Sequence, residues 1–458
     1  MNDSPHTDTP RVVIAGAGLA GCLLARLLGR EGFEVLVVER REDPRNERLA
    51  GGRSINLAIS ARGIDGLRAA GLEAELMQHA IPMTGRMIHS GESTETFQSY
   101  SADSKQAINS VSRSELNLLL LDGADECETV TFRFGLTCSE VDPEANTISF
   151  VDSEGHETTE EAEVIVGADG ANSAVRRGLQ KRPRFSFSQD FLDHGYKELS
   201  IPASEDGPHA PWAIDPKALH IWPHGGSMMI ALPNLDGSFT CTLFWPYEGP
   251  HSFESVDTDS IRSFFDRHYA DASRIMPDLE AQYERNPVGP LGTIRCRPWN
   301  RNGVVLIGDS AHAIVPFYGQ GANASFEDAK RLAEGLIADP GNPIEAIESY
   351  YRDRVDHGNA IADLALANFI EMRDHTGKAW FKWKKKLEHA LHTVLGDRFL
   401  PLYEMVSFST IPYDDARKRA RKQWTLLLII LFVLTPAFIL VTTDLILLIV
   451  SMIIMSGR

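Results

Sequence analysis

The first 40 residues alternate short apolar runs with a helical apolar pattern. Residues 12–15 (Val-Val-Ile-Ala) and residues 35–38 (Val-Leu-Val-Val) predict two strands. Leucines with the spacing of one helix face lie between them: Leu19, Leu23, Leu24, Leu27 and Leu28. The pattern therefore predicts a strand, a helix and a second strand at the start of the chain.

Three glycines and one acidic residue complete this unit. Gly16 would form the tight turn, Gly18 would let the backbone approach a pyrophosphate, and Gly21 would let helix and strand pack closely. The pyrophosphate would then sit at the positive end of the helix. Glu39, which follows the second strand, can accept hydrogen bonds from a ribose and would repel a 2′-phosphate. The unit is the dinucleotide-binding fingerprint, and it favours FAD or NAD over NADP.

The later hydropathy pattern predicts further elements in a mixed order. Residues 50–125 read as a mixture of loop and helix. The other predictions are a strand-rich tract over 129–165, an antiparallel sheet over 190–247, a helix near 260–284, a strand over 304–307, a helix from Asn323 to about Leu336, and helical structure to about residue 400.

Composition excludes several classes of protein. The 458 residues are enough for two or three domains, and the net charge of -18 argues against a nucleic-acid partner. Five scattered cysteines contain no Cys-x-x-Cys pair, and the fifteen histidines show no ligand spacing along a helix. We therefore expect no disulfide framework and no metal site, and a reducing compartment.

The two ends of the chain differ in character. The N-terminal segment has neither a signal peptide nor an Arg-rich presequence. Residues 425–441 are 17 uncharged residues, about 26 Å long as a helix, and they follow a basic run and Trp424. This pattern predicts a membrane anchor with the main body in the cytoplasm. A buried core helix is the alternative, and the apolar stretch also fits either one tilted span or a re-entrant hairpin turning near Asp444.

Two further motifs join a strand to a helix. Residues 167–176 (Gly-Ala-Asp-Gly-Ala-Asn-Ser-Ala-Val-Arg) form one, and residues 308–323, from Gly-Asp-Ser-Ala-His to Gly-Gln-Gly-Ala-Asn, form the other. Gly319 and Gly321 would let backbone amides face a ligand, and the following helix would aim its positive end at the N1–C2=O edge of a flavin. No second Gly-x-Gly-x-x-Gly unit follows a strand, so no separate nicotinamide domain is expected.

In this order, the three motifs resemble the single-component flavoprotein aromatic hydroxylases. The resemblance implies that the first motif holds the adenosine half of FAD, that Asp169 lies near both FAD and the reduced nicotinamide, and that Asp309 lies on the ribityl or phosphate region. Ala322 stands where the family usually has methionine. The implied FAD-binding residues are Gly16, Gly18, Leu19, Gly21, Glu39, Arg40, Ala58, Arg113, Leu136, Asp169, Asp309, Gly321, Ala322 and Asn323.

A closer resemblance is to the kynurenine monooxygenases within that family, over residues 11–415. It is carried by residues 52–58, 85–89, 194–199, 219–224 and 230–234. It implies that the amino-acid end of the substrate meets Arg86, Tyr100, Asn368 and Tyr403, and that Phe317 and Tyr318 wall the cavity. A guanidinium suits such a carboxylate because it binds it with two parallel hydrogen bonds. Without the resemblance, a surface salt bridge would explain Arg86.

The resemblance implies an FAD-dependent monooxygenase that converts L-kynurenine to 3-hydroxykynurenine with NADPH and O2, in tryptophan degradation towards NAD synthesis. A C4a-hydroperoxide of the flavin would carry the oxygen, so no catalytic side chain is expected. Another aromatic or quinone-precursor hydroxylase of this fold is one alternative, and a catalytically weak, membrane-anchored flavoprotein scaffold is another. A flavin halogenase is disfavoured because the chain lacks Trp-x-Trp-x-Ile-Pro.

The expected fold class is α/β (α+β). A discontinuous Rossmann-like FAD-binding domain would span residues 1–180 and 290–345, with parts of 50–125 facing the substrate. An inserted antiparallel-sheet substrate domain would span 181–289, a helical region 346–423, and a membrane anchor 424–458. The membrane would be the mitochondrial outer membrane in a eukaryote, or the cytoplasmic face of the inner membrane in a bacterium.

Overall fold

A computed structural model describes residues 9–46, 56–90, 94–101, 106–374, 387–388 and 390–430. Residues 52–55 of one family-like stretch and residues 431–458 of the predicted anchor lie outside the described residues. No helix in the described part of the chain is long and apolar enough to cross a bilayer.

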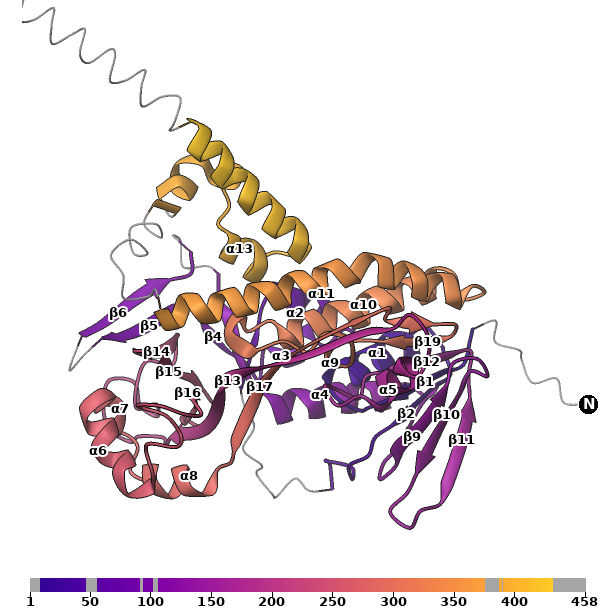
Figure 1. Cartoon of the computed structure of the whole chain (residues 1–458), viewed down its shortest axis with the longest axis horizontal. Coiled ribbons are helices and arrows are strands. Elements are labelled where there is room, and N and C mark those ends of the chain that lie inside the picture. The colour runs from indigo at the N-terminus through magenta and orange to yellow at the C-terminus, as the bar shows by residue number, and fades with distance from the viewer. Residues whose placement is uncertain are drawn as a thin grey trace, which may run out of the picture.

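A six-stranded sheet forms the centre of the nucleotide-binding half (Figure 1). Its strands are apolar and buried, as expected for a parallel sheet that is covered on both faces. β19 comes from a segment 137 residues or more beyond β12, yet it pairs with β12 in parallel, so the sheet draws on both ends of the chain. The order is β18 (Asn300–Arg301), β19 (Val304–Leu306), β12 (Val164–Gly167), β1 (Val12–Ala15), β2 (Val35–Val38) and β8 (Val130–Arg133).

Helices from distant parts of the chain cover this sheet. α1 (Leu19–Gly29) packs against α4 (Arg113–Asp125) and α10 (Gly321–Ala338). α10 also contacts α2 (Ala61–Ala69) and the long α11 (Pro343–Asp374), which runs beside it in Figure 1. The strand predicted over 12–15, its helix and the strand over 35–38 are confirmed, as is the strand over 304–307 apart from its last residue.

Two small sheets flank the central one. One contains β9 (Thr137–Asp142), β10 (Thr147–Val151) and β11 (Glu157–Glu161), which confirms the strand-rich tract. The other contains β3 (Asn56–Ile59), β7 (Ile108–Ser112) and β4 (Ile81–Met83). Short helices α3 (Glu73–Leu76) and α5 (Ala174–Gln180) complete this region.

A seven-stranded sheet forms the second half of the molecule, and it confirms the antiparallel sheet predicted over 190–247. Its order is β17 (Val288–Arg297), β13 (Ser186–Ile201), β16 (Phe239–Pro246), β15 (Ser227–Pro233), β14 (Ala218–His224), β5 (Gly85–Ser90) and β6 (Thr94–Ser99). β5 joins its edge by pairing in parallel with β14. The prediction of loop and helix for residues 50–125 is therefore wrong in part, because long-range pairing makes strands of polar segments with weak local patterns.

The helix predicted near 260–284 is three helices instead. They are α6 (Thr258–His268), α7 (Ala270–Arg274) and α8 (Leu279–Arg285). Asp257 and Ser260 form a capping box that starts α6. Pro277, which lacks a backbone N–H, lies between α7 and α8 and cannot continue a helix.

The C-terminal region passes back over the nucleotide-binding half. After α9 (Asp309–His312) and the 3-10 turn η1 (Pro316–Tyr318), helices α10 and α11 confirm the predicted helical region as far as Asp374. The turn η2 (Gly396–Arg398), α13 (Leu402–Ser407) and a helix over residues 413–430 follow. The helix predicted from Asn323 begins two residues earlier, at Gly321.

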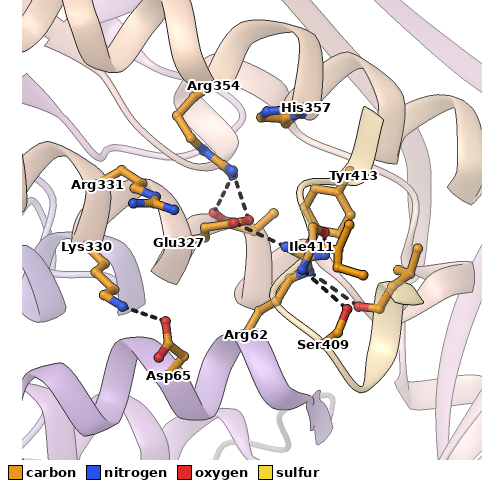
Figure 2. Close-up of polar contacts among 12 residues, drawn as sticks. Arg62, Asp65, Glu327, Lys330, Arg331, Arg354, His357, Ser409, Ile411 and Tyr413 are labelled. Atoms are coloured by element: carbon orange, nitrogen blue, oxygen red, sulfur yellow. Dashed lines mark hydrogen bonds and ion pairs between the residues drawn. The ribbon is translucent and has the colours of Figure 1, made fainter. Parts of the chain in front are cut away.

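A buried ion network fastens this C-terminal region to the core (Figure 2). The Glu327 carboxylate accepts from Arg62 at 3.1 Å and pairs with Arg354 at 2.9 Å. Arg62 also donates to the backbone carbonyl of Ile411 and lies 4.0 Å from the ring centroid of Tyr413. One carboxylate on α10 thus holds α2, α11 and the segment after α13 together.

We expect Glu327→Gln to lower the free energy of unfolding by about 3–5 kcal/mol, because it leaves buried guanidinium charges without their partner. Urea unfolding of the FAD-bound protein would measure the loss. Asp65→Asn is the control, since Asp65 pairs with Lys330 at 2.6 Å in a partly exposed position (Figure 2). The control should lose less than about 1 kcal/mol. Equal, small losses in both variants would contradict the role given to Glu327.

Candidate active site

The glycine turn after β1 is closely packed at Gly16 and Gly21 but not at Gly18. A Cβ on Gly16, whose φ is +108°, would lie 2.5 Å from the Ala168 carbonyl oxygen, and a Cβ on Gly21 would lie 2.0 Å from the Gly16 oxygen. A Cβ on Gly18 would meet no atom within 4 Å. Gly16 and Gly21 are therefore required by the fold, whereas Gly18 borders free space at the start of α1. Leu19, the first residue of that helix, is half-buried there.

Glu39 is a buried carboxylate at the end of β2, beside this turn. Its Oε2 accepts from the Ala17 amide at 3.0 Å, and its Oε1 accepts from the Arg41 Nε at 2.8 Å. Burial raises the pKa of Glu39, but the hydrogen bonds and charge of Arg41 outweigh burial and lower it overall. Leu136 lies next to Glu39, because its amide donates to the Glu39 carbonyl. Arg40 is exposed, and the contact with Glu39 is made by its neighbour Arg41.

The second motif and the start of the third are joined by hydrogen bonds. The Asp169 carboxylate accepts from the Ala174 amide at 2.6 Å and from the Ser310 hydroxyl at 3.2 Å. Arg176 donates to the Ser310 carbonyl at 2.8 Å, and the Gly170 amide donates to the Ser310 hydroxyl. Much of the hydrogen-bonding capacity of Asp169 is therefore used within the protein. These hydrogen bonds hold the start of α5 against α9.

Asp309 is the first residue of α9, next to Ser310, which joins the second and third motifs. Its side chain is exposed, yet enough protein surrounds it that burial raises the pKa of the carboxyl, against the opposing charge of Arg113. Arg113, at the start of α4, is exposed as well. An acid and a cation that are both accessible and electrostatically coupled are suited to a polar ligand.

The buried carboxylate of Asp328, on α10, holds the turn before Asp309 in place. It accepts from the Gly308 amide at 2.9 Å, contacts His312 Nε2 at 2.5 Å and accepts from Arg354 at 2.8 Å. Burial raises the pKa of Asp328, but His312 and Arg354 lower it to about 2. Gly308 has a φ of +58°, and a Cβ there would lie 2.8 Å from the Ser325 hydroxyl. The turn that presents Asp309 thus depends on an ionised Asp328.

The third motif supplies an open helix terminus. Asn323 is fully buried: its side-chain amide donates to the carbonyls of Ala58 and Gly319, both at 2.8 Å, and its oxygen accepts from the Ser60 amide. The Asn323 side chain therefore serves the fold, and only its backbone is available to a ligand. Gly321 and Ala322, the first residues of α10, are half-buried, and a Cβ on Gly321 would meet only one atom, 3.9 Å away.

Neither α1 nor α10 has a side-chain cap or an acidic residue in its first turn, among the residues that the structure describes. Their first amides and positive ends are therefore free to face an anionic or electron-rich ligand. Together with the free space at Gly18, this agrees with a dinucleotide whose pyrophosphate lies at α1 and whose flavin edge lies at α10.

Arg86 forms the centre of a cation and phenol cluster on the neighbouring sheet. Its guanidinium carbon lies 4.4 Å from the ring centroid of Tyr403 and 5.7 Å from that of Tyr100. Tyr403 stacks with Tyr100 at 5.8 Å and with Tyr318 at 5.7 Å. Burial raises the pKa of both Tyr100 and Tyr318, so these phenols stay protonated. Residues from β5, the turn after β6, η1 and α13 are thus brought together.

Two buried polar atoms of this cluster lie close to its other side chains but make no well-formed hydrogen bond to the described residues. The Arg86 Nε and the Tyr100 hydroxyl oxygen have no hydrogen-bond partner within the described ranges. Buried donors are rarely left unpaired, because each costs about 1–3 kcal/mol. We interpret them as donors for a ligand that carries a carboxylate.

An aromatic wall separates this cluster from the interior of the large sheet. Phe317 stacks on Phe369 at 4.4 Å and tilts against Phe244 at 4.9 Å. The Asn368 side chain donates to the Phe317 carbonyl at 2.6 Å. Asn368 therefore holds the aromatic wall in place through Phe317, the residue that directly precedes Tyr318. The six predicted substrate residues thus form one continuous group.

Several residues of the site carried no signal in the sequence. Arg41, Asp328 and Gln320 act only through contacts, such as the 3.0 Å hydrogen bond from Tyr413 to Gln320. Arg176 belongs to the second motif. The sequence showed its position in that motif but not its hydrogen bond to Ser310. The one hint in the sequence for Asp328 was a second acidic residue directly after Glu327 in an otherwise regular helix pattern.

Comparison with known proteins places the chain in a family. The family model described as FAD binding domain matches residues 9–365. A kynurenine 3-monooxygenase of Dictyostelium discoideum is 46% identical over 421 residues, which are 89% of this chain and 90% of the relative. One of Myxococcus xanthus is 44% identical over 405 residues, 88% of this chain and 86% of the relative.

Two groups of solved structures share the fold at low identity. A tetrameric form of 2-methyl-3-hydroxypyridine-5-carboxylic acid oxygenase has a TM-score of 0.67 at 18% identity, over 82% of this chain and 95% of that one. P. aeruginosa PqsL in complex with 2-aminobenzoylacetate has a TM-score of 0.63 at 23% identity, over 80% of this chain and 97% of that one.

We expect Gly18→Val to fold normally and to bind little FAD. The φ of Gly18 is -82°, which valine tolerates, and the added side chain meets only the space in which a pyrophosphate would lie. Visible absorbance of the purified protein measures the bound flavin, and circular dichroism checks the fold. Gly341→Val is the control, because Gly341 is also open and exposed but lies after α10, away from the turn. A full complement of FAD in Gly18→Val would contradict the assignment.

Proposed function

Because this chain belongs to the kynurenine 3-monooxygenase family of FAD-dependent hydroxylases, we propose that it hydroxylates L-kynurenine at ring position 3, with NADPH and O2. The observation that carries the proposal is the Arg86 cluster, whose buried donors have no hydrogen-bond partner among the described residues and lie beside the flavin-facing motifs. The product, 3-hydroxykynurenine, would continue the degradation of tryptophan towards NAD. An assay of NADPH oxidation with and without L-kynurenine, with the product identified by mass spectrometry, tests this directly.

The Arg86 cluster suits the amino-acid end of the substrate. A guanidinium can hold a carboxylate through two parallel hydrogen bonds, and its Nε is one of the unpaired atoms. The protonated Tyr100 hydroxyl can donate to the same carboxylate. The site therefore favours an aromatic amino acid over a quinone precursor, whose ring carries no such carboxylate.

The aromatic wall would position the ring of the substrate. Phe317 and Tyr318 belong to the third motif, and Tyr318 stacks on Tyr403 of the Arg86 cluster, so a substrate held by its carboxylate would extend along them towards the flavin. Rings that fill this space also exclude water from the reacting atoms. FAD, when bound, supplies the transfer of electrons from NADPH and the activation of O2. The role of the protein is to orient the two rings and to stabilise charge.

The N-terminus of α10 would stabilise the reduced cofactor. Negative charge builds on the N1–C2=O edge of a flavin when it is reduced, and an uncapped helix start provides amides and a positive dipole end for that charge. Asp309 and Arg113, which are exposed and electrostatically coupled, would meet the ribityl and phosphate part.

We also propose that the C-terminal tail anchors the enzyme to a membrane, with the catalytic body on the cytoplasmic side. The helix over 413–430 carries Arg421 and Lys422 ahead of its apolar end. That end exposes Leu426, Leu428, Ile429 and Ile430 to between 42% and 61%. Exposed apolar side chains after basic residues suit a lipid surface, at the mitochondrial outer membrane or the bacterial inner membrane.

We expect Arg86→Ala to lower kcat/KM for L-kynurenine by roughly 30- to 1,000-fold, which is about 2–4 kcal/mol of transition-state binding. Arg86→Lys should recover only part of the loss, because an ammonium keeps the charge but not the two parallel hydrogen bonds. Bound FAD should not change in either variant. Steady-state kinetics and flavin absorbance measure these outcomes.

Arg68→Ala is the matched control, because Arg68 pairs with Glu73 at an exposed position on the protein surface. It should leave turnover unchanged. If Arg86→Ala turned over L-kynurenine like the unaltered enzyme, the assignment of the substrate site would be wrong.

We expect truncation after Gln423 to convert a membrane-bound protein into one that is recovered without detergent. The full chain should pellet with membranes after a carbonate wash, since insertion of a long apolar segment is effectively irreversible. The truncated protein should keep FAD, because the three flavin motifs lie upstream of residue 330, and should couple NADPH use to hydroxylation modestly less well. The coupling should fall because Tyr403 and Tyr413 lie in the segment that leads into the tail.

A chain in which an unrelated membrane anchor replaces the tail is the control. It should pellet again and regain coupling if the tail acts only as a tether. Recovery of the full chain in the soluble fraction without detergent would refute the anchor.

A further inference from the structure

Three histidines lie together on the large-sheet half of the molecule, apart from the flavin-facing motifs. His224 ends β14, His251 lies in the loop after β16, and His268 ends α6. One ring nitrogen from each histidine lies within 4.8 Å of the others. The sequence spacing did not predict this group, because its members come from three separate elements rather than from one helix face.

The distances suit a shared ion. His224 Nε2 and His251 Nδ1 are 3.3 Å apart. Two nitrogens at about 2.0–2.1 Å from a tetrahedral zinc ion lie about 3.3–3.4 Å apart. The centroid of the His268 ring is 4.4 Å from that of His224 and 5.1 Å from that of His251. His268 is half-buried at a helix end, so a small side-chain rotation would complete the set.

Packing and a loop hydrogen bond hold these imidazoles near one another. A neutral imidazole offers a lone pair to a metal. The Phe264 ring packs edge-on against both His224 and His251. The loop is held by hydrogen bonds from the Ser252 hydroxyl to Gly249, so His251 is presented from a fixed position.

We propose that His224, His251 and His268 bind one divalent transition-metal ion of the zinc class, with a further position open to water. Imidazole ligands select zinc, copper or nickel over magnesium and calcium, which prefer oxygen. The ion would join the β14–β15 turn, the loop after β16 and the end of α6. His194 connects that turn to the aromatic wall. Its Nε2 forms a 2.9 Å hydrogen bond with the Gly226 carbonyl, and its ring packs against Phe369.

The test uses full-length, FAD-bound protein purified without a polyhistidine tag and stripped with a chelator. Titration with zinc sulfate in a calorimeter should give one site per chain, and the melting temperature should rise with zinc. Cobalt should give ligand-field bands at longer wavelength than the flavin. His224→Gln, His251→Asn and His268→Gln should each weaken zinc binding by more than about 100-fold, which exceeds the usual 10- to 100-fold cost of losing an outer-shell partner.

The choice of Asn at position 251 protects the fold. His251 has a φ of +58°, a backbone region that asparagine tolerates better than most residues. His79→Asn is the control, because His79 is exposed in the other half of the molecule. Its zinc binding should equal that of the unaltered protein. FAD content and circular dichroism identify any variant that fails to fold, and the other two variants then decide the outcome.

Three results would overturn the proposal. The first is the absence of stoichiometric zinc binding, which would leave only a hydrogen-bonded histidine pair. The second is zinc binding that persists in all three variants. The third is an equal loss in His79→Asn.

Discussion

The buried carboxylate of Asp328 is the interaction on which the nucleotide-binding half depends. It joins the Gly308 amide, His312 and Arg354, and so connects the end of β19 with α9, α10 and α11. The adjacent Glu327 then extends the same charge network to Arg62 and the segment after α13. Removal of any one of these charged groups would leave a buried partner charge uncompensated, which would strongly destabilise the folded protein.

This network explains how distant segments form one active site. Arg86 and Tyr100 come from the edge of the large sheet, Tyr318 from the turn before α10, and Tyr403 from α13. Tyr403 reaches the cluster because Arg62 holds the carbonyls of Val406 and Ile411, a few residues further along. The segment that completes the substrate site is thus the one that leads to the predicted membrane tail.

The polar side chains of the site divide into two groups. Asp169, Asn323 and Asn368 are occupied by bonds within the protein and set the positions of turns and rings. Arg86 Nε and the Tyr100 hydroxyl are buried without a hydrogen-bond partner in the described part of the chain, and the first amides of α10 have no side-chain cap, so these groups are suited to bind a ligand. Asp309 is exposed beside them in the third motif. Family likeness alone could not separate these groups, because both belong to the same motifs.

The sequence by itself determined the nucleotide-binding unit and its strands. The apolar runs at 12–15 and 35–38, the glycine spacing and Glu39 are local signals, and each has a direct physical meaning. Tertiary structure decided the rest. β5 is a strand because it pairs with β14, and β6 is a strand because it pairs with β5. The single helix expected near 260–284 is three helices, with Pro277 between the last two. The Arg41–Glu39 contact is local, but no simple pattern marks it. The Asp328 network and the three-histidine group depend on contacts between separate elements, and no local pattern of residues encodes such contacts.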